Sequence, residues 1–175
     1  MLHGIQAWVA LPTELEEIEP RFEHYPAHDI PRLSEPGLEL TVIAGEAYGA
    51  TSPVQTSSAT VYVEADMEEG ASLETPADVD EIAVYAVSGA VEVDGQPLPA
   101  GRMAILSARA TASVSAQSPA KVMILGGGTL QGERLLSWNF VSSFPERLEQ
   151  ARQDWKSGKF DDVPGDPEFI PLPER

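Results

Sequence analysis

The sequence predicts an all-β fold, an antiparallel β-barrel or sandwich followed by one C-terminal α-helix. Short segments of alternating apolar residues recur roughly every ten residues after Gly37, which is typical of antiparallel sandwiches and barrels. Apolar residues at helical spacing form a convincing stripe near the C-terminus, where Leu148, Ala151 and Trp155 would share one helix face. These observations divide the chain into three parts, residues 1–36, 37–130 and 131–175.

The first part, residues 1–36, is predicted to be an N-terminal strand followed by a proline-rich linker. Residues 2–11 alternate apolar and polar side chains as a strand does, and Pro12 would end that strand. Residues 13–18 leave room for one helical turn. Residues 21–36 contain three prolines, which favours an extended and irregular connection.

The second part, residues 37–130, is predicted to be the barrel. Its predicted strands are residues 38–44, 60–67, 82–87, 90–93, 103–106, 112–116 and 121–125. Ser88-Gly89 is interpreted as a turn between paired strands, and Asp94-Gly95 as a second tight turn. Gly126-Gly127-Gly128 lacks the Lys-Ser/Thr pair that follows a phosphate-binding loop, so a turn at the barrel edge is predicted there.

The third part, residues 131–175, is predicted to be a helix and an extended tail. Ser143 and Glu146 have the spacing of a capping box, with Pro145 in the first turn of the helix. Gly158 is placed to end that helix. Residues 163–175 contain four prolines and should be extended.

Composition excludes some classes of partner and chemistry. The net charge is −17, from 28 acidic and 11 basic residues, and so acidic a surface does not suit nucleic acid. The chain has no cysteine, which excludes disulfides and thiolate chemistry. Neither an apolar run of about 18 residues nor a signal-peptide pattern is present. We therefore expect a cytoplasmic protein with no membrane partner.

The glycine spacing of residues 70–116 resembles the two sequence motifs of the cupins. Gly70 and Gly89 would open and close the first motif, and Gly101 would open the second. The metal-ligand positions of the two motifs then fall on Pro76, Asp78, Ile82 and Ala112. The resemblance implies a jelly-roll-type cupin barrel.

The residues at these four positions are poor metal ligands. A first-row metal in a cupin is held by imidazoles and a carboxylate, whereas Pro76, Ile82 and Ala112 carry no lone pair on their side chains. Asp78 alone would bind a metal weakly. We therefore predict no metal site, no catalytic residue and no bound cofactor in this barrel.

Other polar residues give weaker signals. His24 and His28 are four residues apart, but Pro26 lies between them and argues against a helix that would bring them together. Tyr62 and Tyr85 are candidates to line a ligand pocket, with simple packing on a sheet face as the alternative.

Four stretches resemble the pirin family more specifically than cupins in general. They are LHGIQAWVALP (residues 2–12), EPRFEHYPAHDIP (19–31), IAGEAYGATSPV (43–54) and WNFVSSFPERLEQARQDWKSGKF (138–160). The resemblance implies two tandem cupin barrels with iron in the N-terminal one. This chain would correspond to the C-terminal half, without the N-terminal metal-binding barrel. For a complete double barrel, the resemblance to pirins implies quercetin 2,3-dioxygenase activity and, in animals, iron-dependent regulation of transcription factors.

Three functional hypotheses follow from the resemblance. The first is a non-catalytic structural or interaction module that forms a homo-oligomer or binds a metal-bearing pirin half, because the apolar face of residues 2–11 would otherwise be exposed. The second is part of a quercetin 2,3-dioxygenase whose metal site is supplied by another chain. The third is a metal-free barrel that binds a small molecule. In the first and third cases, the chain alone would not be an enzyme.

Overall fold

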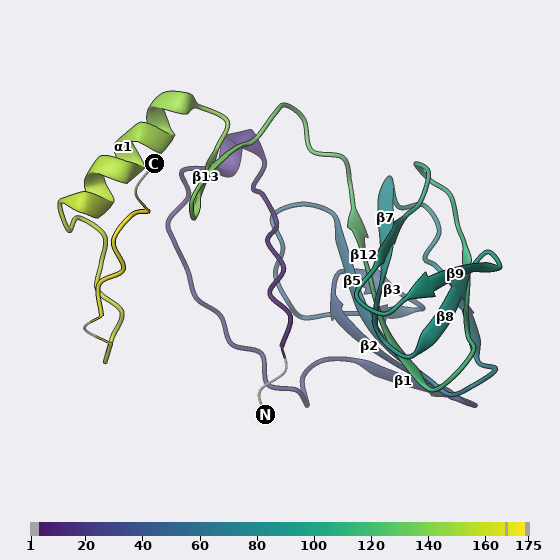
Figure 1. The fold of residues 1–175 in the computed structure, drawn as a ribbon. Coiled ribbons are helices and arrows are strands. Elements are labelled where there is room, and N and C mark those ends of the chain that lie inside the picture. Colours follow the sequence, from purple (N-terminus) through teal and green to yellow (C-terminus); the bar gives the residue numbers. More distant parts are fainter. Residues whose placement is uncertain (1–3, 167, 174–175) are drawn as a thin grey trace. The chain divides into compact units, whose positions relative to one another are not determined.

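The computed structural model describes residues 4–166 and 168–173, which form two compact units (Figure 1). Residues 20–129 form the first, which we call the barrel unit. The described residues up to Glu19 and from Leu130 onward form the second, which we call the terminal unit. Among the described residues, no helix has both the length and the apolar character needed to cross a membrane.

The barrel unit consists of two antiparallel sheets and a short hairpin. The larger sheet has the order β1 (Arg32–Glu35), β2 (Leu38–Ala44), β5 (Thr60–Met67), β12 (Ala120–Gly127), β7 (Glu81–Ser88) and β10 (Met103–Ile105). The smaller has the order β6 (Ser72–Glu74), β11 (Ser113–Ala116), β8 (Ala90–Val93) and β9 (Gln96–Pro99). The hairpin pairs β3 (Glu46–Ala47) with β4 (Ala50–Thr51).

Alternating side chains of the two sheets make one apolar core. In β5, Val61, Val63, Ala65 and Met67 are buried while the residues between them are more exposed, as the period of a strand requires. β12 pairs with β5 on one side and β7 on the other, and its central residues Val122, Met123 and Ile124 are all buried. The buried cluster takes side chains from both sheets, so the barrel interior is packed core.

All seven predicted strands occur in the barrel unit, with small differences at their ends. The strands β1, β3, β4, β6 and β9 were not predicted, because they have two to four residues each and lack a repeated apolar alternation. β1 lies inside the stretch expected to be irregular and pairs with β2. β9 contains Pro97 and Pro99, which is compatible with its place at the edge of the smaller sheet.

The two predicted turns have different outcomes. Asp94 and Gly95 have positive φ values of 48° and 72° and join β8 to β9 in a hairpin, so this prediction is confirmed. The prediction that Ser88-Gly89 joins paired strands is wrong, because β7 and β8 belong to different sheets. A Cβ atom at Gly89 would lie 2.4 Å from the carbonyl oxygen of Pro119, so glycine is needed where the chain crosses between the sheets.

The prediction of an edge turn at Gly126–Gly128 is also wrong. Gly126 and Gly127 are the last two residues of β12. A Cβ atom would lie 2.3 Å from the Glu81 carbonyl oxygen at Gly126 and 2.2 Å from that of Ala59 at Gly127. These glycines therefore allow a close approach of neighbouring backbone.

The terminal unit contains a 3₁₀ turn, a small hairpin and the helix. These are η1 (Thr13–Leu15), β13 (Leu135–Ser137), β14 (Phe140–Ser142) and α1 (Pro145–Lys156). The prediction of a strand over residues 2–11 is wrong for the described residues 4–11, which are not paired with any described strand; residues 2 and 3 lie outside the described residues. The helical turn predicted in residues 13–18 is confirmed as η1.

The helix α1 ends as predicted and begins differently. Gly158 has φ +66° and follows the last helical turn. Phe144, not Ser143, is the N-cap residue, and no side chain caps the helix, so the predicted capping box is wrong. The Ser143 hydroxyl instead donates to Glu16 Oε1 at 2.6 Å. Leu148 and Ala151 on the predicted apolar face are buried.

Candidate functional site

A groove of about 780 Å³ opens in the barrel unit and is the best candidate for a functional site. Its walls come from the β3–β4 hairpin, the start of β5, the segment after β6 and the end of β12. The lining residues are Gly45, Glu46, Ala47, Tyr48, Gly49, Thr56, Ala59, Thr60, Val61, Glu74, Thr75, Pro76, Ala77, Asp78, Val79, Asp80, Gly127 and Gly128.

The groove includes two of the four positions that correspond to cupin metal ligands. Pro76 and Asp78 line it, whereas the side chains of Ile82 and Ala112 are only 2% exposed and belong to the core. Thr75 connects these regions, because its Oγ1 accepts from the Ala112 amide at 2.9 Å and its amide donates to the Ala112 carbonyl at 2.9 Å.

The residues at the four positions do not fit a metal ion. Pro76, Ile82 and Ala112 have no donor atom in their side chains, and Asp78 is one carboxylate. Across the part of the chain that the structure describes, no group of three or more His, Asp and Glu side chains is arranged to hold a metal. His28 Nε2 lies 3.4 Å from Asp29 Oδ1 at the surface, and His3 lies outside the described residues. That the chain uses no metal stays a prediction.

The charge of the groove is acidic. Glu46, Glu74, Asp78 and Asp80 line it, and no Lys, Arg or His of the described residues does. Asp80 is paired, since Arg109 Nε and Nη2 each lie 2.9 Å from its Oδ1. The Arg109 side chain holds the pKa of Asp80 below its ordinary value, so this carboxylate stays ionised.

Tyr48 gives the groove an aromatic wall. Its hydroxyl donates to the Glu74 carbonyl oxygen at 2.8 Å, and burial raises its pKa above its ordinary value, so the hydroxyl stays protonated. Its backbone has φ +53°, a left-handed conformation that is uncommon for a tyrosine. Strained residues of this kind cluster at ligand sites.

The tyrosines proposed from the sequence are in other places. Tyr62 and Tyr85 are half-buried on β5 and β7, and neither lines the groove. The signal that points to Tyr48 is its position between Gly45 and Gly49, which marks a tight hairpin. A Cβ atom at Gly45 would lie 1.7 Å from the Thr60 carbonyl oxygen, so this hairpin sits directly against β5.

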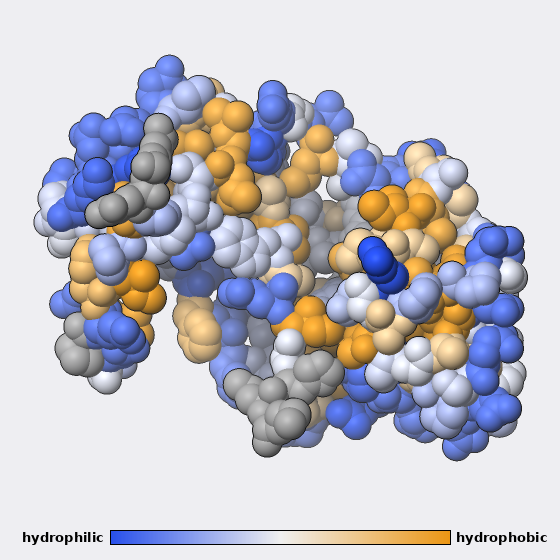
Figure 2. Space-filling view, viewed as in Figure 1, coloured by the Kyte–Doolittle hydropathy of each residue, from blue (hydrophilic) through white to orange (hydrophobic). Residues whose placement is uncertain are grey.

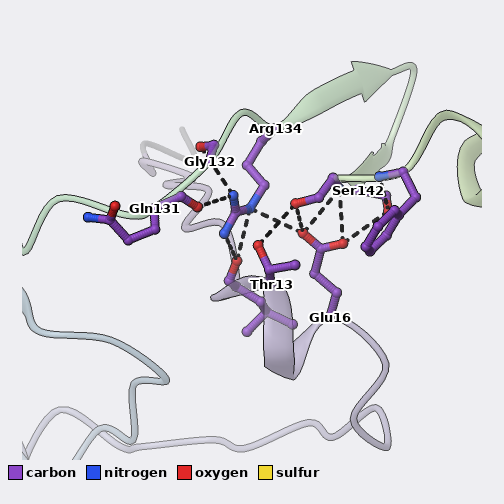
Figure 3. Close-up of polar contacts among 9 residues, drawn as sticks. Thr13, Glu16, Gln131, Gly132, Arg134 and Ser142 are labelled. Carbon is purple, nitrogen blue, oxygen red and sulfur yellow. Dashed lines mark hydrogen bonds and ion pairs between the residues drawn. The ribbon is translucent and has the colours of Figure 1, made fainter.

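A second polar cluster, around Glu16, fastens the two chain segments of the terminal unit to each other (Figure 3). Glu16 Oε1 lies 3.1 Å from Arg134 Nε, and the side chains are only 9% and 12% exposed. Glu16 also accepts from the Ser143 hydroxyl and amide and from the Ser142 hydroxyl. Arg134 donates to the Leu11 carbonyl oxygen at 2.9 Å and 3.1 Å.

The hydrogen bond from the Ser143 hydroxyl, with those from the Ser143 amide and Ser142 and the Arg134 charge, lowers the pKa of Glu16 despite its burial. Because Glu16 and Arg134 satisfy each other and nearby backbone groups, we interpret this cluster as structural.

Apolar side chains reach the surface in both units (Figure 2). In the terminal unit, the exposed large apolar residues include Ile5, Trp8, Val9, Ile18, Leu136, Val141, Phe144, Phe160, Val163, Phe169 and Ile170. Trp155 is surrounded by aromatic rings, with ring centroids 5.1 Å from Trp138, 5.5 Å from Phe160 and 5.7 Å from Phe169. These exposed apolar residues make the terminal unit a candidate surface for binding another protein.

Comparison with known proteins gives the family. The profile of the pirin C-terminal cupin domain matches residues 62–161. A pirin-like protein of Caulobacter vibrioides is 46% identical over 177 residues, covering 99% of this chain and 60% of that protein. Human pirin is 27% identical over 164 residues, covering 90% of this chain and 57% of that protein. The chain thus spans less than two thirds of the length of these relatives.

A solved structure agrees with the fold. The crystal structure of a quercetin 2,3-dioxygenase from Acinetobacter baumannii superposes with a TM-score of 0.86 at 29% identity, over 96% of this chain and 57% of that one. The predicted cupin barrel with one C-terminal helix is therefore confirmed. With the profile match extending over more than half of its residues, the chain belongs to the pirin family.

Proposed function

We propose that this chain is a non-catalytic pirin-like cupin that acts as a structural and interaction module. The observation that carries the proposal is the chemistry of the four ligand positions. Pro76, Ile82 and Ala112 cannot coordinate a metal, and two of them are packed into the barrel core. The apolar side chains that fill the barrel interior supply no group to bind a metal or to transfer a proton.

In this proposal the chain corresponds to the C-terminal barrel of a double-cupin pirin. The match of residues 62–161 to the pirin C-terminal cupin domain supports this correspondence. The shares of 60% and 57% of the lengths of the relatives agree with it. A metal-bearing N-terminal barrel would then lie outside these 175 residues.

The interaction partner that we propose is a second copy of the chain, with a metal-bearing pirin half as the other candidate. The exposed apolar residues of the terminal unit, among them Trp8, Val9 and Leu136, supply the surface. Burial of apolar area stabilises an interface by about 25 cal/mol per Å². Because a two-fold interface uses the same patch on both partners, each copy would cover the patch of the other.

Light scattering on the purified chain tests this proposal. We expect a dimer or larger oligomer that dissociates when Val9→Glu and Leu136→Glu are combined, because two carboxylates would have to be desolvated in the interface. Phe22→Ser is the matched control, since Phe22 is 90% exposed but belongs to the barrel unit. A monomer at all concentrations, or dissociation by Phe22→Ser alone, would contradict the proposed surface.

The second candidate function is a part of a quercetin 2,3-dioxygenase whose metal site is supplied by another chain. The similarity to the quercetin 2,3-dioxygenase of Acinetobacter baumannii favours it. Metal analysis and a quercetin assay on the purified chain separate the two proposals. Stoichiometric iron with turnover in this chain alone would refute the non-catalytic proposal. Turnover that requires an added metal-bearing pirin half would support the second candidate.

A further inference from the structure

The groove in the barrel unit has the size and construction of a small-molecule site. Its volume of about 780 Å³ falls in the range of roughly 300–1,000 Å³ that is typical of ligand pockets. All the described lining residues lie from Gly45 to Gly128, within the barrel unit. Gly45 and Gly127 hold two of its walls in close contact with the neighbouring backbone.

The charge of the lining determines which sign of charge the ligand should carry. Four carboxylates line the groove, and its lining includes no basic side chain from the part of the chain that the structure describes. Asp80 is neutralised by Arg109, whereas Glu46, Glu74 and Asp78 make no ion pair within the described residues. A net charge of −17 on the whole chain adds to the negative potential. An anionic ligand would be repelled, and a cation would be attracted.

The floor of the groove selects an apolar or aromatic ligand body. Ala47 and Val61 are buried there, and Pro76 lines the same groove. The half-buried ring of Tyr48 adds an aromatic face, and its hydroxyl is already occupied by the Glu74 carbonyl oxygen. An ammonium group against such a ring gains a cation–π contribution besides its attraction to the carboxylates.

We propose that the groove binds a small organic amine, a protonated nitrogen carried on an aromatic or apolar body. This goes beyond the structural role and gives the hypothesis of a metal-free ligand-binding barrel a ligand class. The carboxylates Glu46, Glu74 and Asp78 would attract the ammonium group, and the apolar floor would hold the body.

Two probes with the same ring and opposite charge test the proposal. Tryptamine and indole-3-acetate are titrated separately into the full chain at low salt, with binding followed by calorimetry. We expect tryptamine to bind roughly ten times more tightly or better, because like charges repel the acetate. The preference should shrink as salt is added, since Glu46, Glu74 and Asp78 are exposed and salt screens their charges. No tryptamine binding, or equal affinities of the two probes, would overturn the proposal.

Substitutions locate the binding. Glu74→Gln combined with Asp78→Asn removes two groove charges and should weaken tryptamine binding roughly tenfold. Asn tolerates the left-handed backbone of residue 78, which has φ +61°. Glu69→Gln combined with Glu92→Gln is the control, because it removes equal charge outside the groove and should leave the affinity nearly unchanged.

A substitution that fills the groove tests, without a change of charge, whether tryptamine binds there. Ala59 lies beside Gly128, where an added Cβ atom would be 3.5 Å from the Ala59 Cβ, so Ala59→Phe places a ring within the groove. We expect this variant to keep the fold by circular dichroism and to lose tryptamine binding. Wild-type affinity in Ala59→Phe, or equal losses in the groove and control pairs, would show that tryptamine binds elsewhere and overturn the assignment.

Discussion

In the barrel unit, Val42, Val63 and Ile124 are fully buried between two sheets, whereas in the terminal unit the prominent enclosed contact is the ion pair of Glu16 and Arg134. Among the described residues, the buried apolar side chains of the terminal unit are Leu148 and Ala151. Its aromatic rings, including Phe160 and Phe169, pack on one another and remain partly exposed.

The barrel unit and the terminal unit are thus stabilised by different kinds of interaction. The barrel unit depends mainly on apolar burial and ladder hydrogen bonds, which do not change with pH, and its Asp80–Arg109 ion pair lies at the surface. The terminal unit joins two distant segments of the chain through the charged carboxylate of Glu16, whose contribution to stability changes with pH. The three tryptophans, Trp8, Trp138 and Trp155, all lie in the terminal unit, so their fluorescence reports on it selectively. The two long sheets lie in the barrel unit and the helix α1 lies in the terminal unit, so the strand component of the far-ultraviolet circular dichroism reports mainly on the barrel.

The largest expected effect comes from a cavity in the barrel core. Ile124 lies opposite Val63 in β5 and Val84 in β7 and has no exposed surface. Ile124→Ala should lower the free energy of unfolding of the barrel unit by about 4 kcal/mol. Urea denaturation followed by circular dichroism measures this change, while the fluorescence transition should move less.

The matched control is Ile105→Ala, because Ile105 is 80% exposed on the edge strand β10. It should change the stability by less than about 0.5 kcal/mol. Equal shifts of the circular dichroism and fluorescence transitions in Ile124→Ala would mean that the two units unfold together, and the comparison would fail.

The next effect should appear in the terminal unit. Glu16→Gln removes the charge that accepts hydrogen bonds from Ser143 and pairs with Arg134. We expect a loss of about 2 kcal/mol in the fluorescence transition, since bonds to charged groups contribute more than neutral ones. Glu17→Gln is the neighbouring control, because the Glu17–Arg147 pair is exposed and should contribute under about 1 kcal/mol. Equal effects of both substitutions would show that the enclosure of Glu16 does not matter.

Acid should destabilise the terminal unit more than the barrel unit. The pKa of Glu16 is lower in the folded chain than its ordinary value of 4.5, so its contribution to stability is complete above that value and is lost as pH falls through the folded pKa. Asp154 in the same unit also has a lowered pKa, caused first by its hydrogen bond from Lys159. The free energy of unfolding measured from the fluorescence transition should therefore fall from neutral to acid pH. Its slope against pH should be smaller in Glu16→Gln than in the wild type. An unchanged slope in that variant would exclude Glu16 as its source.

The longer barrel strands were predictable from the sequence because each alternates apolar residues against one core. The period of two shows in residues 60–67, which form β5 with the predicted face inward. The same signal misled in residues 4–11, because alternation shows how a strand would bury one face but not whether a partner strand is present. Ser143 misled for a similar reason, since its hydroxyl had a stronger acceptor in Glu16, 127 residues away.

The candidate site was only half predictable. The glycine spacing that located Pro76 and Asp78 also located the segment that lines the groove, because glycines fix turn positions. The place of Tyr48 in the groove is harder to predict, since only the spacing of Gly45 and Gly49 indicates its hairpin, whose strands have two residues each. Gly126 and Gly127 look like turn residues in the sequence, because local sequence does not report a close approach by a distant strand.

The smallest effect should come from the aromatic tail. Phe169 stacks on Trp155 with ring centroids 5.7 Å apart, but 58% of its surface is exposed. Phe169→Ala should therefore cost only about 0.5–1 kcal/mol, the usual contribution of one aromatic pair. The indole nitrogen of Trp155 would still donate to the Ile170 carbonyl oxygen, which keeps the tail in place. The fluorescence transition measures the change, and a loss as large as that of Glu16→Gln would mean that aromatic contacts, not the charged cluster, stabilise the terminal unit.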